Sequence, residues 1–318
     1  MRVATSIAIG NHATPDLATA AVTEAMKKAN LTVASSVLLL LTSEFASAPQ
    51  AAIRAAAKAA NCLKIMGCSA TGIFTEEDWV IDAPAAAAMV FGDEISLQAP
   101  NISLNGQPVF TLSAPNAINS TWLNNGNTRF GGVSGDAIGH GPFSVWQNAK
   151  GDVTGYVEAV FQGAKVATKA SHGLQLLTQP QKIERVQDYD LLSLGGQKSL
   201  NSLQKSWKMH SKSDEPAPLH LIMAIYANSP DAIVKGDYQQ TSLISHDDDT
   251  ASITLAHQLK PGTYLSWGLR SPMVAQADLA VVTQQLVSEL GSPAEFGLLF
   301  SCRTGKCIAV WLADSGRF

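Results

Sequence analysis

Residues 1–70 alternate between short apolar runs and stretches with a helical period. Short, mainly apolar runs occur at residues 3–10, 36–43 and 63–67, and the second of them is continuous. Between them, at residues 15–30 and 50–61, alanines and larger apolar residues recur every three or four positions. A period near 3.6 is typical of a helix that buries one face, and short continuous runs are typical of strands buried on both faces. The region predicts the order β-α-β-α-β, and crossover helices of this length favour a parallel sheet.

The two predicted helices have recognisable ends. Thr14 and Pro15 form a favourable helix start, because proline is well tolerated at the first helical position. Ser47 stands three residues before Gln50, which is the spacing of a capping box and predicts that Ser47 accepts a hydrogen bond from the Gln50 amide. The second helix is expected to end at Asn61.

The pattern of apolar and polar residues changes after residue 70. After the third strand the apolar runs are short and are separated by Gly, Pro, Asn and Asp, which is typical of hairpins. Helical periodicity returns at residues 197–207 and is strongest at residues 272–290. Further strands are expected at residues 219–226 and 296–302, and a hairpin is expected around the acidic turn 246–249.

These elements define a fold class and a domain division. A chain of 318 residues suits two domains, and the polar segment 211–218, which holds two prolines, is the best linker. We therefore predict a mixed α/β protein. Residues 1–210 would form a largely parallel sheet extended by antiparallel hairpins, and residues 219–318 a smaller mixed sheet with one long helix.

Composition excludes several classes of partner. The net charge is −4 and no block of Lys or Arg could follow a phosphate backbone, so nucleic acid is not an expected partner. No apolar stretch is as long as a membrane helix, and the first residues do not form a signal peptide, so we expect a cytoplasmic protein without membrane insertion. Four sparse cysteines and seven histidines show no zinc or disulfide pattern, so no cofactor is expected.

The stretch IMGCSATGI at residues 65–73 is the first candidate for chemistry. It fails as a hydrolase elbow, since Thr71 stands where the second glycine of G-x-S-x-G belongs. As a loop at the carboxyl end of the third strand, it would lie where open α/β sheets bind ligands. Cys68, Ser69 and Thr71 are then ligand readers, and Cys68 as a thiolate nucleophile is the alternative.

Further candidates follow other predicted strands. The glycine-rich GGVSGD contributes Gly132, Ser134 and Asp136, either as a bend or as a backbone that approaches a ligand closely. His172, in SHG, would lie at a loop mouth. Arg270 directly precedes a helix start, where a guanidinium and helix N–H groups could receive a carboxylate or phosphate.

The last candidates, Cys302 and Arg303, end the strand FGLLFSC. The sequence that follows imitates the end of a P-loop. However, Phe300 replaces the required first glycine and Cys307 the magnesium-binding hydroxyl residue, so a P-loop is not expected.

Taken in order, several motifs resemble those of one family. SVLLLLTSE, IMGCSATGI, GGVSGD, GAKV with SHG, GLRSPM with ADL, and FGLLFSCRTGK are similar to successive segments of the FIST proteins over nearly the whole chain. The resemblance implies a FIST N-terminal domain in residues 1–210 and a FIST C-terminal domain in residues 219–318. The second domain is expected to be shortened at its end.

The FIST resemblance implies a sensory module without enzymatic activity. It would bind a small molecule, such as an amino acid or a related organic acid, between its two domains. It would signal to a partner such as a histidine kinase or a cyclic-dinucleotide enzyme. Two alternatives stay open: a haem-binding nitric oxide sensor with His172 or His140 as axial ligand, and a thiol-dependent enzyme using Cys68 or Cys302.

Overall fold

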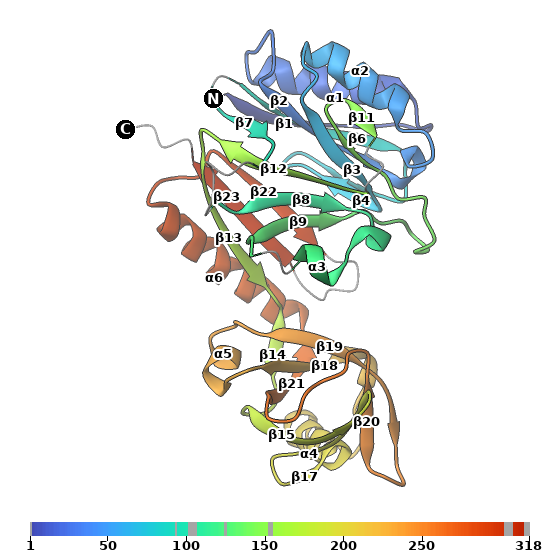
Figure 1. Ribbon diagram of the computed structural model, residues 1–318, viewed down its shortest axis with the longest axis vertical. Helices are drawn as coiled ribbons and strands as arrows, with labels where there is room; N and C mark the ends of the chain where they lie inside the picture. The colour runs from blue at the N-terminus through green and yellow to red at the C-terminus, as the bar shows by residue number, and fades with distance from the viewer. Residues whose placement is uncertain are drawn as a thin grey trace. The chain divides into compact units, whose positions relative to one another are not determined.

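The protein has a mixed α and β fold (Figure 1). The computed structural model describes residues 2–92, 94–100, 107–123, 126–151, 155–301 and 308–314. The chain divides into two compact units. Unit 1 comprises Met1–Lys169, Gln284–Phe300 and Ala309–Phe318, and unit 2 comprises Ala170–Thr283 and Ser301–Ile308.

These units differ from the predicted domains. The chain passes into unit 2 at residue 170, so the segment 170–210 does not belong with the N-terminal residues, and the expected linker 211–218 lies inside unit 2. Residues 284–300 return to unit 1. A boundary predicted along the sequence assumes that each domain is one continuous segment. It therefore does not account for a chain that leaves unit 1 and later returns to it. That the two halves are FIST-type domains stays a prediction.

Unit 1 contains two helices near its N-terminus, one very short helix and many strands. They are β1 (Val3–Ile9), α1 (Pro15–Lys28), β2 (Ser36–Thr42), α2 (Gln50–Ala60), β3 (Ile65–Ala70), β4 (Gly72–Phe74), β5 (Trp79–Ile81), β6 (Ala85–Phe91), β7 (Ser96–Gln98), β8 (Val109–Ser113), α3 (Ser120–Leu123), β9 (Arg129–Val133), β10 (Val145–Gln147), β11 (Lys150–Gly151), β12 (Tyr156–Gln162), β13 (Lys165–Ser171), β22 (Phe296–Ser301) and β23 (Ile308–Asp314).

The main sheet of unit 1 is mostly antiparallel, so the prediction of a largely parallel sheet is wrong. Its strand order is β1-β6-β2-β3-β10-β11, and among these neighbours only β2 and β3 pair in parallel. The cause is β6, which lies between β1 and β2 and runs antiparallel to both. Every residue of this apolar strand is buried, which suits a central position better than a hairpin at the edge.

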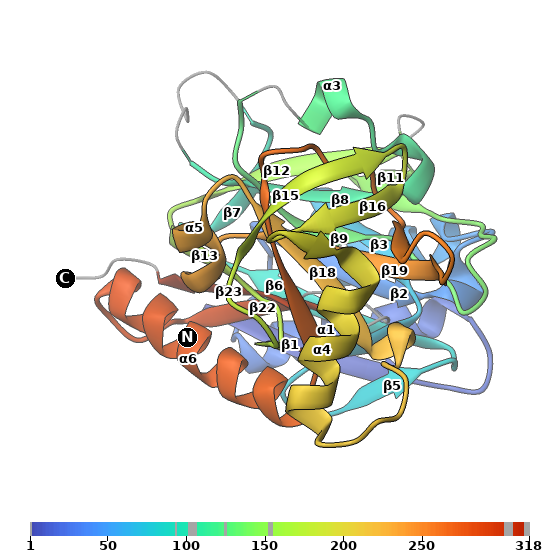
Figure 2. The same ribbon diagram turned by 90° about the horizontal axis from the view of Figure 1, so that it is seen from below.

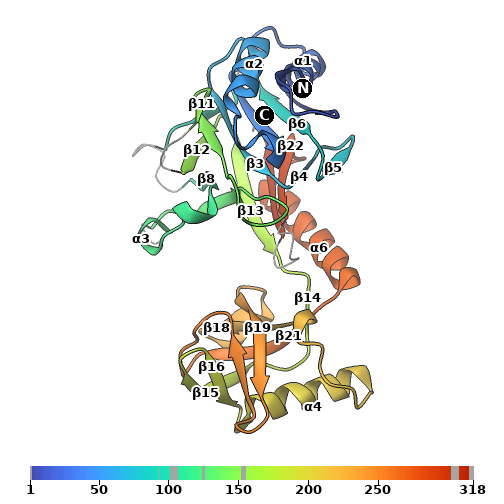
Figure 3. The same ribbon diagram turned by 90° about the vertical axis from the view of Figure 1, so that its right-hand side faces the viewer.

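Unit 1 is built in layers. Helices α1 and α2 lie side by side over one face of the main sheet (Figure 3), where their alanines pack against β2 residues such as Val37, Leu39 and Leu41. On the other face Leu38, Met66 and Cys68 belong to a second core that includes phenylalanines of β8, β9, β12 and β22. This core joins the main sheet to a four-stranded sheet with the order β7-β12-β8-β9.

Unit 2 is organised around antiparallel strands. Its elements are β14 (Leu174–Leu176), β15 (Gln181–Gln187), β16 (Asp190–Leu194), β17 (Gln197–Lys198), α4 (Ser199–Ser211), β18 (Ile222–Ala227), α5 (Pro230–Val234), β19 (Gln239–Asp247), β20 (Ser252–Leu255) and β21 (Tyr264–Arg270). Helix α6 (Pro272–Leu290) begins in unit 2, and its last residues belong to unit 1.

Six of these strands close into a barrel. The pairing runs β21-β15-β16-β20-β19-β18, and β18 pairs with β21 again, so the ring has no open edge. All six pairings are antiparallel, so the predicted mixed sheet is wrong for this unit. Leu200 and Leu203 of α4 pack into the core of the barrel, and α4 lies beside its strands (Figure 2). The expected hairpin at the acidic turn is confirmed as β19–β20.

Candidate functional site

IMGCSATGI forms strands, so the prediction of a loop after the third strand is wrong. Strand β3 continues to Ala70, and Cys68 pairs with Leu40 on one side and Val145 on the other. The first glycine makes room for protein rather than for a ligand. A Cβ at Gly67 would lie 1.7 Å from the carbonyl oxygen of Leu39 and 2.5 Å from Nε1 of Trp146, so the indole occupies the space that the missing side chain leaves.

Cys68 is a core residue. Its side chain is 4% exposed and packs in the apolar layer between the sheets. Burial raises the pKa of the Cys68 thiol to about 12, because a thiolate would lose its hydration. At neutral pH this cysteine is therefore a protonated thiol, which does not suit a nucleophile.

Ser69 and Ser134 meet in a closed hydrogen-bond network. The Ser134 hydroxyl donates to the Ser69 carbonyl oxygen at 2.8 Å, and the two hydroxyl oxygens lie 2.7 Å apart. Because Ser134 has used its only proton, Ser69 is the donor between the hydroxyls. The Ser69 Oγ in turn accepts from the Ser144 backbone N–H at 3.1 Å. Both buried hydroxyls thus spend their donors inside the protein and join β3 to the end of β9.

The other predicted residues near this pair, Thr71, Asp136 and Gly132, also lie against parts of the protein itself. Thr71 lies near the glycine-rich loop, since a Cβ at Gly135 would be 3.4 Å from Thr71 Oγ1. The Asp136 carboxylate accepts hydrogen bonds from the backbone N–H groups of Gly139 and Gly141. A Cβ at Gly132 would meet the Phe300 ring at 2.7 Å. Unit 1 therefore brings together six predicted residues, namely Cys68, Ser69, Thr71, Gly132, Ser134 and Asp136.

In unit 2 the SHG turn is held by a carboxylate that the sequence reading missed. Asp278 Oδ2, on α6, accepts hydrogen bonds from Ser171 Oγ at 2.6 Å, from the His172 N–H at 2.9 Å and from the Gly173 N–H at 3.2 Å. Gly173 has φ +62°, and a Cβ there would lie 2.7 Å from the Ala275 Cβ. Glycine is therefore needed both for the left-handed backbone and for the close approach of α6.

The His172 imidazole is half-buried and stacked. Its ring lies 4.3 Å from the Tyr238 ring centroid at an interplanar angle of 27°. Burial lowers the pKa of His172, although the Asp278 charge and a hydrogen bond with the Gly236 backbone oppose this shift. The buried Nδ1 has no hydrogen-bond partner among the described residues, so we assign the Gly236 bond to Nε2. A neutral imidazole with Nε2–H leaves Nδ1 as an acceptor.

Arg270 lies at the end of β21, and Leu174, two residues after His172, is its direct partner on β14. Its Nη2 is 3.1 Å from the sulfur of Met223, which is a weak acceptor. Its buried Nε has no partner among the described residues. Tyr238, Leu174 and Met223 belong to one small apolar cluster, so His172 and Arg270 lie around a common apolar patch.

The remaining predicted residues do not join these groups. Cys302 and Arg303 lie outside the described residues. His140, the other haem candidate, is exposed. The described part of the chain contains no group of three or more His, Cys, Asp or Glu residues that could hold a metal ion. It also contains no helix that is both long and apolar enough to cross a membrane.

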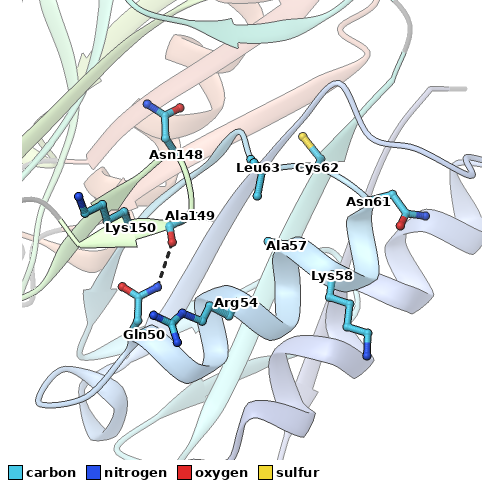
Figure 4. Close-up of a pocket in the computed structure, with 10 residues that line it drawn as sticks. All are labelled: Gln50, Arg54, Ala57, Lys58, Asn61, Cys62, Leu63, Asn148, Ala149 and Lys150. Atoms are coloured by element: carbon cyan, nitrogen blue, oxygen red, sulfur yellow. Dashed lines mark hydrogen bonds between the residues drawn. The ribbon is translucent and has the colours of Figure 1, made fainter.

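Unit 1 also has an open pocket that the sequence did not indicate (Figure 4). Its volume is about 790 Å³, and it lies between α2 and the β10–β11 turn. Three of its lining residues, Arg54, Lys58 and Lys150, are cationic, and none of the described lining residues is acidic.

Comparison with known proteins gives no independent assignment. No protein-family model matches the chain, and no curated protein matches it significantly. The FIST resemblance therefore rests on the motifs alone.

Proposed function

We propose that the protein is a sensory module of the FIST type that binds a free amino acid in unit 2. The observation that carries this proposal is a pair of buried nitrogen atoms, His172 Nδ1 and Arg270 Nε, without partners among the described residues. A buried polar atom without a partner costs about 1–3 kcal/mol, so such atoms need an explanation. A bound ligand that pairs with both of them supplies one.

The two nitrogens have complementary chemistry. The Arg270 guanidinium offers an N–H donor and a positive charge, which suit a carboxylate. The neutral His172 Nδ1 offers a lone pair, which suits the N–H of an ammonium group. Asp278, whose charge acts on His172, adds a favourable field for that ammonium group. A carboxylate and an ammonium group on one small molecule define an amino acid.

A dicarboxylic acid fits this arrangement less well. Its second carboxylate would meet an imidazole acceptor and the Asp278 charge, which repel it. The neighbouring Leu174, Met223 and Tyr238 are apolar or aromatic, so they favour an amino acid with an apolar side chain.

The position of the site along the chain provides a route for signalling. The SHG turn directly follows the passage of the chain into unit 2 at residue 170, and α6 carries Asp278 before the chain returns to unit 1 at residue 284. A ligand that bound beside this turn would act on both connecting segments. We infer that the resulting change is read by a partner protein, such as a histidine kinase or a cyclic-dinucleotide enzyme.

The alternative functions gain no support from the described residues. A haem needs room for a large planar ring beside the imidazole that ligates it, whereas the His172 ring is stacked on Tyr238. A thiol-dependent enzyme needs a thiolate, whereas Cys68 is buried and its pKa is raised.

A thermal-shift screen followed by calorimetry tests the proposal. An amino acid at 100 times its Kd should stabilise the protein by about 2.7 kcal/mol. Arg270→Gln should weaken this binding at least about tenfold, because a charged hydrogen bond is lost. Arg185→Gln, at an exposed arginine of the same unit, is the matched control and should bind normally. If no amino acid bound, or if both variants bound equally well, the site would be wrong.

His172 has a matched control as well. His257 also stacks on a tyrosine, Tyr226, and is exposed. His172→Phe keeps a ring against Tyr238 but removes Nδ1, so it should weaken amino acid binding about tenfold, whereas His257→Phe should not. Equal effects of the two substitutions would show that Nδ1 does not contact the ligand.

A further inference from the structure

The pocket of unit 1 has an electrostatic character that the amino acid site does not explain. Arg54, Lys58 and Lys150 line it, and the lining that the structure describes holds no carboxylate. The side chains of all three are exposed, and none of these side chains has a hydrogen bond or ion pair with another described residue. The protein as a whole carries a net charge of −4, so a hollow with three cations among its described lining residues departs from the general composition of the chain.

Helix α2 supplies one wall of this pocket. Gln50, Arg54, Lys58 and Asn61 are spaced by three or four positions, so they lie along one side of the helix. The opposite side, which includes Ile53, is buried in the core. The wall is therefore anchored by core packing, and its polar groups are presented outward as a row (Figure 4).

The second wall is the tight turn between β10 and β11. Asn148 and Ala149 both have positive φ, of 53° and 56°, which is unfavourable for an alanine. The Gln50 side chain donates a hydrogen bond to the Ala149 carbonyl oxygen at 2.9 Å. This bond fastens the turn to α2 and so fixes the approach of Lys150 to the pocket.

The end of the pocket is less polar. Asn61 closes α2 in the left-handed conformation, and its side chain donates to the Thr32 carbonyl oxygen. Cys62 and Leu63 follow it, and the Leu63 side chain is 73% exposed. Figure 4 shows Arg54 beside Gln50, near the turn, whereas the chain turns back after Asn61 through Cys62 to Leu63, which is drawn above Ala57.

We propose that this pocket binds a phosphorylated small molecule of the nucleotide class. A guanidinium and two ammonium groups suit the charge of a phosphate chain, and the amides of Asn61 and Asn148 suit sugar or base hydrogen bonds. The apolar Leu63 suits the face of a base. The volume of about 790 Å³ is far larger than one phosphate needs and lies within the range of small-ligand sites.

Calorimetric titration of the full chain with ATP, AMP, adenosine and inorganic pyrophosphate tests the proposal. We expect ATP to bind more tightly than AMP, and adenosine to show no binding, because the cations recognise the phosphates. ATP should also bind more tightly than pyrophosphate, because the base adds contact with Leu63. Citrate serves as a polyanion without phosphate and should bind more weakly than ATP.

Variants locate the binding. Arg54→Gln and Lys150→Gln should each weaken ATP binding about threefold to tenfold, and the double variant more than tenfold. Lys64→Gln is the matched control, since Lys64 is an exposed cation just beyond the lining residues, and it should leave ATP binding unchanged. All of these side chains are exposed, so none of the changes should prevent folding.

Several results would overturn the proposal. Absence of ATP binding would do so, and so would equal binding of citrate and ATP. Equal weakening by Lys64→Gln and Arg54→Gln would indicate diffuse attraction to the surface instead of a site. The amino acid site is tested separately, because Arg270→Gln should leave ATP binding intact.

Discussion

Replacing Ser134 by alanine tests whether the Ser69–Ser134 pair is part of the fold or part of a receptor. Three hydrogen bonds are at stake: Ser134 Oγ to the Ser69 carbonyl, Ser69 Oγ to Ser134 Oγ, and the Ser144 N–H to Ser69 Oγ. Each contributes about 1 kcal/mol to the free energy of unfolding. Ser134→Ala removes the first two, and Ser69→Ala removes the last two. Each single variant should therefore lose about 2 kcal/mol.

The double variant makes the prediction sharper. Because the bond between the hydroxyls is lost in both single variants, the double variant should lose about 3 kcal/mol instead of 4, which gives a coupling energy of about 1 kcal/mol. Urea unfolding followed by circular dichroism measures these differences, and the single variants should lower Tm by about 4–8 °C. Ser47→Ala, at an exposed serine of the same unit, should change stability by less than about 0.5 kcal/mol. If Ser134→Ala matched this control, or if the coupling were zero, the closed network would be refuted.

Three further predictions concern stability. Gly67→Ala should cost about 4 kcal/mol or more or prevent folding, because its Cβ would lie 1.7 Å from the Leu39 carbonyl oxygen; urea unfolding of any folded variant checks this. The pKa of Cys68 is raised from 9.0 to about 12, so its contribution to stability is present below pH 9 and is lost as the pH rises toward 12. Unfolding free energies should therefore fall more steeply above pH 9 in the wild type than in Cys68→Ala. The pKa of His172 is lowered from 6.5, so its contribution is present above pH 6.5 and is lost as the pH falls below it; His172→Gln should flatten the Tm profile in that range, and an unchanged profile would contradict the assigned environment.

Helices with a strong apolar period could be predicted from the sequence. Helix α1 begins at Pro15 and α6 begins at Pro272, as the patterns indicated. Their ends are set by local chemistry that the sequence displays directly. The predicted capping box at Ser47 is wrong, because Pro49 occupies the N-cap of α2 without a side-chain cap. The Gln50 side chain instead bonds to Ala149, which is a contact no local rule contains.

The order of the strands could not be predicted in the same way. Alternation and apolar runs identify strands but do not say which strands pair. The alanine-rich β6 reads as one of several short runs, yet it lies between β1 and β2. The barrel of unit 2 is closed by the pairing of β18 with β21, which joins residues such as Ile222 and Leu269. Because these two residues are far apart in the sequence and pair only when the barrel closes, no local sequence pattern indicates the pairing.

The candidate sites were partly predictable for a similar reason. Small polar residues after apolar runs indicated Ser69 and Ser134, but not that they bond to each other. Asp278 was missed as a site residue, although it is the single charged residue within residues 272–288, which is a signal in itself. Its role depends on the packing of α6 against Gly173. The pocket at Arg54 and Lys150 joins segments far apart in the chain, so no motif could display it.

The predicted residues fall into two groups that differ in their hydrogen bonds: Ser69 and Ser134 on one side, and His172 and Arg270 on the other. The Ser69 and Ser134 hydroxyls look like ligand readers in sequence, but each donates its proton to the other serine, so neither has a proton left to give. His172 and Arg270 look less specific, but each keeps one buried nitrogen without a partner among the described residues. A fold gains nothing from leaving such atoms unpaired, since each costs free energy in the empty state. His172 lies in the turn held by Asp278 and Arg270 lies at the end of β21, and a ligand that pairs with both nitrogens explains them better than packing does.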